Sequence, residues 1–265
     1  MRRAGGEFIE KSGPVLYMLR EFRCDLHIHS CLSPCADLGM YPRALVEKAA
    51  LERLDLIAVC DHNSSENTES IMRAAAVHGI RALPGMEIAT AEEVHLIALF
   101  ETIDNLYNIQ NLVYDSLPGR NNEDIFGCQA IVNDLDEVEG FNDKLLIGAT
   151  TRPLEDWVRE IHGLGGLAIA SHIDRESFSI MGQLGFIPPD LRLDALEVSA
   201  RTGLLEARKE FPELYRMPFI TSSDAHFIND IGKAFTLIRM HEATLGELKM
   251  AFAGLKGRMV LEKGA

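Results

Sequence analysis

Short, almost uninterrupted hydrophobic runs alternate along the chain with longer segments in which apolar residues recur at helical spacing. Runs that are apolar at nearly every position are typical of strands covered on both faces, as in parallel sheets. The predicted strands are residues 23–29, 54–60, 80–84, 94–100, 167–171, 195–199, 219–222 and 235–240.

Helices are predicted between these strands. The predicted helices are residues 42–53, 66–78, 154–164 and 243–255. Pro42 suits the first turn of the first helix, and the cluster of Asn and Ser at 63–65 can cap the second. The glycine pair at 165–166 is a typical helix stop. The alternation of strand and helix predicts an α/β fold whose parallel sheet is either open or closed into a barrel.

Residues 117–149 interrupt this alternation because they are polar, acidic and rich in turn residues. We interpret this segment as an insertion on the barrel, either a lid or substrate-selecting loop, or a solvated excursion without function. Residues 1–22 are expected to form a tail or peripheral element, and residues 23–265 one domain with the insertion at about 117–149.

Composition narrows the classes of function. The chain has 265 residues, 47% of them apolar, which suffices for one large α/β domain. The net charge of −14 argues against a broad basic surface for nucleic acid. Five cysteines without a Cys-x-x-Cys pair favour a reduced, cytoplasmic protein. We read no signal peptide and no membrane-spanning segment in the sequence.

Polar residues with metal-binding side chains recur at the ends of the apolar runs. His27 and His29 are two apart on a predicted strand, so both side chains point to the same face. Other candidates occur at the ends of later runs. They are His62, Glu87, His95, His172, Asp224 and His226. Since α/β folds place their sites where parallel strands end, we expect these side chains to converge at one barrel mouth.

Imidazole and carboxylate ligands in this combination suit Zn, Mn or Fe rather than Ca or Mg. The eight candidates exceed what one tetrahedral ion can use. The sequence therefore predicts two or three divalent metal ions.

The same motifs, in this order, resemble those of the polymerase and histidinol phosphatase (PHP) superfamily. The motifs are Asp-Leu-His27-Ile-His29-Ser, Asp61-His62-Asn63, Gly85-Met86-Glu87, His95, Ser171-His172 and Ser223-Asp224-Ala225-His226. The resemblance runs from about residue 23 to 240. It implies a distorted (β/α)7 TIM-like barrel, a di- or trinuclear metal centre at the carboxyl ends of the strands, and hydrolysis of phosphoesters.

The resemblance also implies how the ligands are shared. One metal would be held by His27, His29, Glu87 and Asp224. His62 and His226 would help to hold a second metal. A third would take His95 and His172, with Glu87 bridging.

Cys35 departs from the family pattern, because it stands six residues after His29, where trinuclear members carry histidine. A thiolate is a good ligand for Zn or Fe, so we predict that Cys35 is a ligand. Asp37 is the rival ligand. In the alternative interpretation, Cys35 is a small buried hydrophobic residue and the second metal site is weak or empty.

Residues around the ligands are expected to support them. Asp25, Asp61 and Glu197 are candidates to orient the ligand rings through their distal N–H groups. Arg175 and Arg201 are candidates to bind substrate phosphate, because guanidinium matches its oxygens bidentately.

These observations predict a metal-dependent phosphoesterase that uses a metal-activated water and no side-chain nucleophile. A small phosphorylated metabolite or nucleotide is favoured as substrate over nucleic acid because the chain is acidic and short. One alternative is a metal-dependent C–N hydrolase of the amidohydrolase type, although no lysine falls at a predicted strand end to bridge two metals. The other is a non-catalytic PHP-like module in a larger complex.

Overall fold

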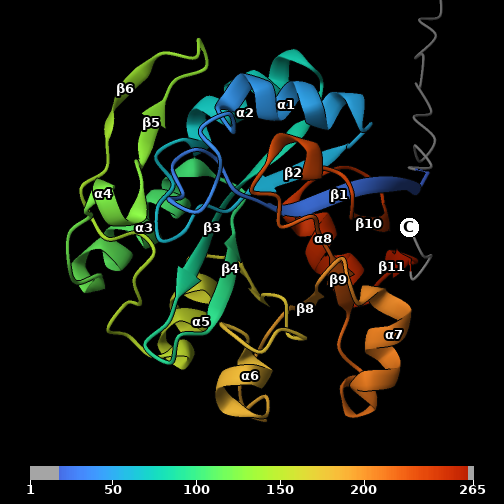
Figure 1. Ribbon diagram of the computed structural model, residues 1–265. Helices are drawn as coiled ribbons and strands as arrows, with labels where there is room; N and C mark the ends of the chain where they lie inside the picture. The colour runs from blue at the N-terminus through green and yellow to red at the C-terminus, as the bar shows by residue number, and fades with distance from the viewer. Residues whose placement is uncertain (1–17, 262–265) are drawn as a thin grey trace, which may run out of the picture.

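A mixed nine-stranded sheet forms the centre of the protein in the computed structural model, which describes residues 18–261 (Figure 1). Its strands are β1 (Arg20–Ile28), β2 (Leu56–Val59), β3 (Arg81–Ala89), β4 (His95–Leu99), β7 (Leu167–Ala170), β8 (Ala195–Val198), β9 (Phe219–Thr221), β10 (Thr236–Met240) and β11 (Met259–Leu261). Their order across the sheet is β11-β10-β1-β2-β3-β4-β7-β8-β9. All eight predicted strands are therefore present, and β11 is an additional one.

The sheet curves until its two sides almost meet. The chain just past β9 returns to the end of β1, where Ala225 forms a parallel bridge with Ile28. The His29 amide donates to the Ala225 carbonyl at 3.0 Å. The predicted fold class, a barrel-like α/β fold, is confirmed. The exact count of seven β/α units is not confirmed, because no helix lies between β3 and β4.

Strand β4 runs antiparallel to both of its neighbours, β3 and β7, so the expected parallel arrangement is wrong at this position. Residues 90–94 between β3 and β4 are too few for the crossover that parallel strands need, and they form a hairpin instead. Strand β10 is also antiparallel to β1. Reversal of β4 places its first residue, His95, opposite Ala89 at the end of β3.

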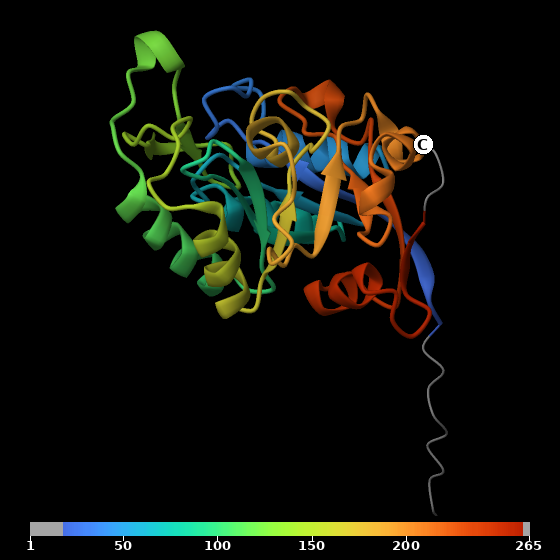
Figure 2. The same cartoon turned by 90° about the horizontal axis from the view of Figure 1, so that it is seen from below.

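Helices pack against the outer surface of the sheet (Figures 1 and 2). They are α1 (Pro42–Leu51), α2 (Thr68–Val77), α3 (Ile103–Ser116), α5 (Leu154–Gly163), α6 (Ile180–Leu184), α7 (Gly203–Glu210) and α8 (Leu245–Phe252), with 3-10 turns at η1 (Pro212–Leu214) and η2 (Ile228–Asp230). Leu45 and Ile71 bury the inner faces of α1 and α2 against β2. Trp157 and Ile109 do the same for α5 and α3 against β4.

Helix α3 was not among the predicted helices. Thr102 accepts a hydrogen bond from the Asn105 amide and caps its first turn. Leu106, Ile109 and Val113 are buried at helical spacing on one face.

Residues 117–149 form an arm that projects from the barrel and contains α4 (Glu123–Phe126) and the two-stranded sheet of β5 (Ala130–Val132) and β6 (Val138–Phe141) (Figure 1). The buried side chain of Asn67 attaches the arm, because its Nδ2 donates to the Ala130 carbonyl at 3.1 Å and its Oδ1 accepts from the Val132 amide at 2.9 Å.

Residues 1–17, most of the predicted tail, lie outside the described residues. Strand β1 begins at Arg20, three residues before the predicted strand. None of the helices between residues 18 and 261 has the length and apolar character needed to cross a bilayer.

Two glycines near the end of α5 offer a matched test of packing in the core. A Cβ on buried Gly166 would lie 2.8 Å from the Leu99 carbonyl oxygen and 2.6 Å from Phe100 Cε1, whereas a Cβ on Gly163 would meet nothing within 4 Å. We expect Gly166→Ala to lower the free energy of unfolding by about 1–3 kcal/mol, because the backbone must move. We expect Gly163→Ala to raise it by about 0.5–1 kcal/mol, since alanine is the better helix former. Urea denaturation of both variants measures the difference, and equal values for the two would contradict this account of the packing.

Candidate metal centre

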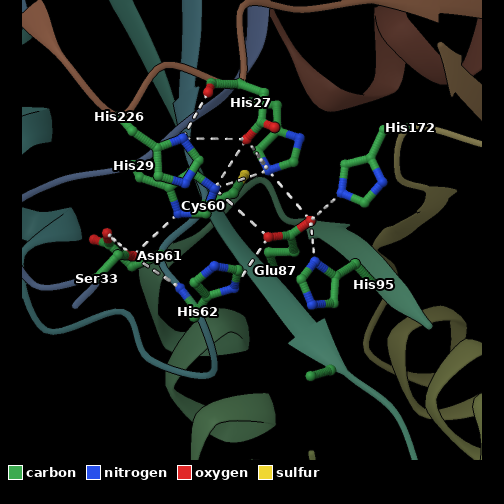
Figure 3. Close-up of polar contacts among 12 residues, drawn as sticks. His27, His29, Ser33, Cys60, Asp61, His62, Glu87, His95, His172 and His226 are labelled. Atoms are coloured by element: carbon green, nitrogen blue, oxygen red, sulfur yellow. Dashed lines mark hydrogen bonds and ion pairs between the residues drawn. The ribbon is translucent and has the colours of Figure 1, made fainter. Parts of the chain in front are cut away.

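The metal-binding side chains predicted from the sequence meet in one pocket at the end of the barrel where β1, β2 and β3 terminate (Figure 3). Strand β1 contributes His27 and His29, and β3 contributes Glu87. The loops after β2, β7 and β9 contribute the remainder, and the start of β4 contributes His95. The histidines and carboxylates among them are buried except Asp224 and His226, which are partly buried, and Cys35, from the loop after β1, is exposed.

Glu87 lies at the centre of the pocket (Figure 3). Its Oε1 is 3.2 Å from His95 Nδ1 and 3.5 Å from His172 Nε2, and its Oε2 is 3.1 Å from His62 Nδ1. Oε1 is buried and has no hydrogen-bond partner among the described residues. Burial opposes ionisation of this carboxyl, but the neighbouring His95 and His27 outweigh it and hold the pKa of Glu87 well below its usual range.

His27, His29 and Asp224 form a second convergence beside Glu87. The Nε2 atoms of the two histidines are 3.1 Å apart, and they lie 3.4 and 3.2 Å from Asp224 Oδ1. Neutral His27 that donates Nδ1–H to Glu197 presents a lone pair at Nε2. Lone pairs and carboxylate oxygens that point at a common space, together with the unpartnered Glu87 Oε1, form a donor set that fits a divalent cation.

The backbone is strained at several positions in or beside the pocket, three of which directly flank or carry candidate ligands. Asn63, His172 and Asp224 have φ angles of 51°, 30° and 47°. Left-handed backbone at residues other than glycine costs about 1–3 kcal/mol each and persists where the surroundings impose it, commonly at functional sites.

Hydrogen bonds orient the imidazole rings of His27 and His29 on β1, but not all of the partners are the residues predicted for this role. Glu197 Oε2 accepts from His27 Nδ1 at 2.9 Å, as expected of an orienting carboxylate. Asp61 reaches His29 indirectly. It accepts from the Ser33 hydroxyl at 2.6 Å, and Ser33 Oγ is 3.0 Å from His29 Nδ1.

Asp25 forms no hydrogen bond or ion pair with His27, contrary to the expectation that it would orient a ligand ring. Its carboxylate accepts from the amides of Ser223 and Gly232 at 2.9 and 3.1 Å, and so positions the loop that carries Asp224. Burial is the main reason that the pKa of Asp25 is raised to about 7.

Cys35 lies at the exposed rim of the pocket. Its Sγ and a nitrogen from each of His29, His62 and His226 all lie within 4.8 Å of one another. Enclosure of the thiol opposes its ionisation, but hydrogen bonds with His226 and His62 outweigh this and lower the pKa of Cys35 to about 7. The rival Asp37 uses its carboxylate to accept from the Gly39 amide at 2.8 Å.

The two arginines occupy different positions. Arg175 lines the metal pocket, a cavity of about 210 Å³, and its guanidinium donates to Asp224 Oδ2 at 2.6 Å. Arg201 does not line this pocket. It lines an adjoining cavity of about 970 Å³ that also includes Arg175.

Three residues at the site were missed by the sequence analysis. Ser33 connects Asp61 to His29, and Ile147 and Phe178 line the metal pocket. A serine four residues after His29 carried no distinguishing signal, and neither apolar residue belongs to a metal-binding motif.

Fold and site together define a metal-binding barrel of the α/β class. The model of the PHP domain matches residues 25–184, and a second model, described as PHP-associated, matches residues 207–253. The chain therefore belongs to the PHP domain family, and the family predicted from its motifs is confirmed. The enzyme class predicted from the sequence, hydrolysis of phosphoric esters, agrees with the name of metal-dependent phosphoesterase that two proteins of similar fold carry.

Three known proteins show what the chain resembles. It is 33% identical over 93 residues to the PolC-type DNA polymerase III of Oceanobacillus iheyensis, and the match covers 35% of this chain and 6% of that protein. The lesion-specific endonuclease Q of Pyrococcus furiosus has a similar fold, with a TM-score of 0.67 at 18% identity over 91% of this chain and 58% of the other. A two-domain Bacteroides vulgatus protein containing a predicted PHP-like metal-dependent phosphoesterase has a TM-score of 0.54 at 16% identity, over 88% and 63% of the two chains.

Replacement of Glu197 tests the role of the carboxylate behind His27. Glu197→Gln keeps the shape of the side chain but weakens the bond to Nδ1, so we expect metal affinity to fall about 10- to 100-fold. Asp194→Asn is the matched control, because Asp194 pairs with His162 at 2.8 Å and neither residue lines the metal pocket. Titration with a metal-sensitive dye measures both affinities, and an equal effect of the two substitutions would show that the Glu197 contact has no special role.

Replacement of Cys35 tests whether the thiol is a ligand. We expect Cys35→Ser to lose one metal equivalent, because serine is a poor ligand for the ions that thiolates prefer. Cys128→Ser should keep the full content, since Cys128 does not line the pocket. Elemental analysis counts the metal, and a cobalt-loaded sample should lose its sulfur-to-metal charge-transfer band only in Cys35→Ser. If Cys35→Ser binds as many metal ions as the wild-type protein, Cys35 is not a ligand and the alternative interpretation, a packing residue, is favoured.

Proposed function

We propose that this chain is a hydrolase that cleaves the phosphoester of a small phosphorylated metabolite or nucleotide at two or three divalent metal ions of the Zn, Mn or Fe type. The observation that carries the proposal is the buried Glu87 carboxylate, which lies within 3.5 Å of ring nitrogens of five histidines. A buried charge of this kind requires compensation, and metal ions supply it while leaving room for an anionic substrate.

The predicted ligands divide into three groups in this proposal. His27, His29 and Asp224 form one, Cys35, His62 and His226 the second, and His95 and His172 the third, with Glu87 bridging. When bound, such ions polarise phosphoryl oxygens and bring the pKa of a water molecule towards ~7.

Other side chains act directly on the substrate. Arg175 already pairs with a carboxylate at the pocket wall, so a phosphoryl oxygen can compete for its guanidinium. Arg201 would act farther out, on a part of the substrate that enters the larger cavity. No side chain is needed as nucleophile, because an activated water performs the attack.

The remaining predictions are consistent with this function. We treat residues 23–265 as one PHP barrel domain with residues 117–149 as its insertion. All five cysteines lie within the described residues and are unpaired, which supports a cytoplasmic location.

Two other functions are less well supported. A C–N hydrolase with a bridging carbamylated lysine is disfavoured because no lysine lines either cavity. A non-catalytic module in a larger complex is disfavoured because such a role does not require the predicted ligands to converge in one pocket. Action on nucleic acid is suggested by endonuclease Q, yet the net charge of −14 opposes a long phosphate backbone.

Metal removal and one substitution test the proposed reaction. Purified protein should release phosphate or nitrophenol from generic phosphoesters, lose this activity with a chelator, and regain it with Zn, Mn or Fe. Glu87→Gln should lower the activity by more than about 100-fold, since loss of a ligand exceeds the cost of losing a supporting partner. Glu155→Gln, which alters an exposed carboxylate at the start of α5, is the control.

A different set of results would contradict the proposal. Fully metal-loaded protein that cleaves no monoester or diester in a broad panel would exclude it. Cleavage of amides or lactams by the same sample would favour the C–N hydrolase, and less than one metal per chain after gentle purification would favour the non-catalytic module.

A further inference from the structure

The side chain of Asn67 is turned away from the helix that it precedes. Asn67 occupies the N-cap of α2, where asparagine ordinarily accepts a hydrogen bond from an amide of the first turn, yet its side chain forms no such bond. Its Oδ1 accepts instead from the Val132 amide, and its Nδ2 donates to the Ala130 carbonyl, so this side chain holds β5 of the arm. Because the side chain is fully buried, loss of these partners would leave polar atoms unsatisfied away from water.

The same amide nitrogen is also connected to the metal centre. Asn67 Nδ2 donates to Ser30 Oγ at 3.0 Å, and the Ser30 hydroxyl donates to Asp61 Oδ2 at 2.6 Å. The other oxygen of Asp61 accepts from the Ser33 hydroxyl, and Ser33 Oγ is in turn a partner of His29 Nδ1 (Figure 3). A continuous series of hydrogen bonds between buried side chains therefore runs from the backbone of β5 to a predicted metal ligand.

The direction of these hydrogen bonds determines which nitrogen of His29 carries a proton. The Ser33 hydroxyl has one hydrogen and donates it to Asp61, so Ser33 Oγ accepts from His29 Nδ1–H. His29 Nε2 is then left with a lone pair, as metal binding requires. If Asp61 moved, the Ser33 hydroxyl could donate to Nδ1 instead, and Nε2 would be protonated. Alignment of Asp61 by Ser30 and Asn67 therefore favours the tautomer that binds an ion.

A second buried asparagine attaches the arm directly beside a candidate ligand. Asn63 follows His62 in the chain, and its Nδ2 donates to the carbonyls of Leu146 and Gly148, both at 2.8 Å. Ile147, the residue between these two carbonyls, lines the metal pocket. The arm is therefore held at two points by the short segment of chain that follows His62.

We propose that Asn67 is a positioning residue that couples the arm to the metal centre, so that the arm must be attached for the ion at His29 to bind with full affinity. This inference rests on the metal sites of the proposed function and not on the reaction. Since such coupling is reciprocal, ion binding holds the arm in place by the same factor. The arm is then a means of controlling the metal content from outside the pocket.

Titration of the full chain with Zn²⁺ in competition with a dye tests the effect of the arm on the ion. We expect Asn67→Ala to weaken Zn²⁺ binding at one or more sites by about 3- to 30-fold, which is the size of effect that substitutions along such networks have. Asn105→Ala is the matched control, because Asn105 Nδ2 donates to the Leu164 carbonyl at 3.0 Å and neither residue lines the metal pocket. The control should bind Zn²⁺ with wild-type affinity.

Hydrogen exchange followed by NMR tests the effect of the ion on the arm, which a merely structural role of Asn67 would not produce. Saturating Zn²⁺ should slow exchange of the Val132 amide by about 3- to 30-fold, because this amide donates to Asn67. The Glu137 amide donates to Asn133 Oδ1 within the arm, so its exchange should not change.

Ser30→Ala separates coupling from attachment of the arm. This substitution interrupts the series between Asn67 and Asp61 but leaves both hydrogen bonds from Asn67 to β5. In Ser30→Ala, Zn²⁺ should therefore slow exchange of the Val132 amide by less than about twofold, since the ion no longer acts on the arm through Asn67.

Specific outcomes would overturn the inference. Equal Zn²⁺ affinities of Asn67→Ala and the wild-type protein would do so, as would equal slowing of the Val132 and Glu137 amides by Zn²⁺. If Asn67→Ala does not fold, Ser30→Ala decides, because undiminished slowing in that variant would contradict the coupling. A wild-type protein that binds no Zn²⁺ would overturn both this inference and the proposed function. Coupling in a metal-loaded protein that cleaves no phosphoester would support the inference and contradict the proposed reaction alone.

Discussion

The structure depends on the cost of burying the Glu87 carboxylate. This side chain is 1% exposed, and one of its oxygens has no hydrogen-bond partner among the described residues. An isolated carboxylate in such a place would neutralise itself by taking up a proton. The ring nitrogens around it prevent this, since they keep its pKa low, and each histidine is in turn held by its own strand or loop. The separate elements of the barrel are therefore coupled through one charged group.

The reversed strand β4 shows how the barrel accommodates this arrangement. A parallel strand at this position would begin at the opposite end of the barrel and carry its first residue away from the site. The hairpin between β3 and β4 avoids this and brings His95 beside Glu87. The departure from regular β/α alternation therefore contributes directly to the donor set.

Much of the fold and of the candidate site could be predicted from the sequence, because apolar runs mark buried strands and the ligand types are chemically distinctive. The direction of β4 could not, since a strand covered on both faces has the same hydrophobic pattern in either orientation. Glu197 was recognised as a partner for a ring, but the position of Asp25 depends on the loop at residues 223–232, which no local pattern describes. Ser33 and Phe178 were missed because a hydroxyl relay and an aromatic surface become visible only when distant segments are brought together.

The bridge between Ile28 and Ala225 gives the barrel a thermodynamic property of its own. Ala225 lies between Asp224 and His226, so the same three residues complete the sheet and supply side chains to the pocket. Closure of the sheet and ion binding are therefore linked equilibria, and each must favour the other by the same free energy. Binding of an ion by Asp224 and His226 would stabilise the closed form of the sheet. The affinity for that ion would therefore depend on the fraction of molecules in which the sheet is closed.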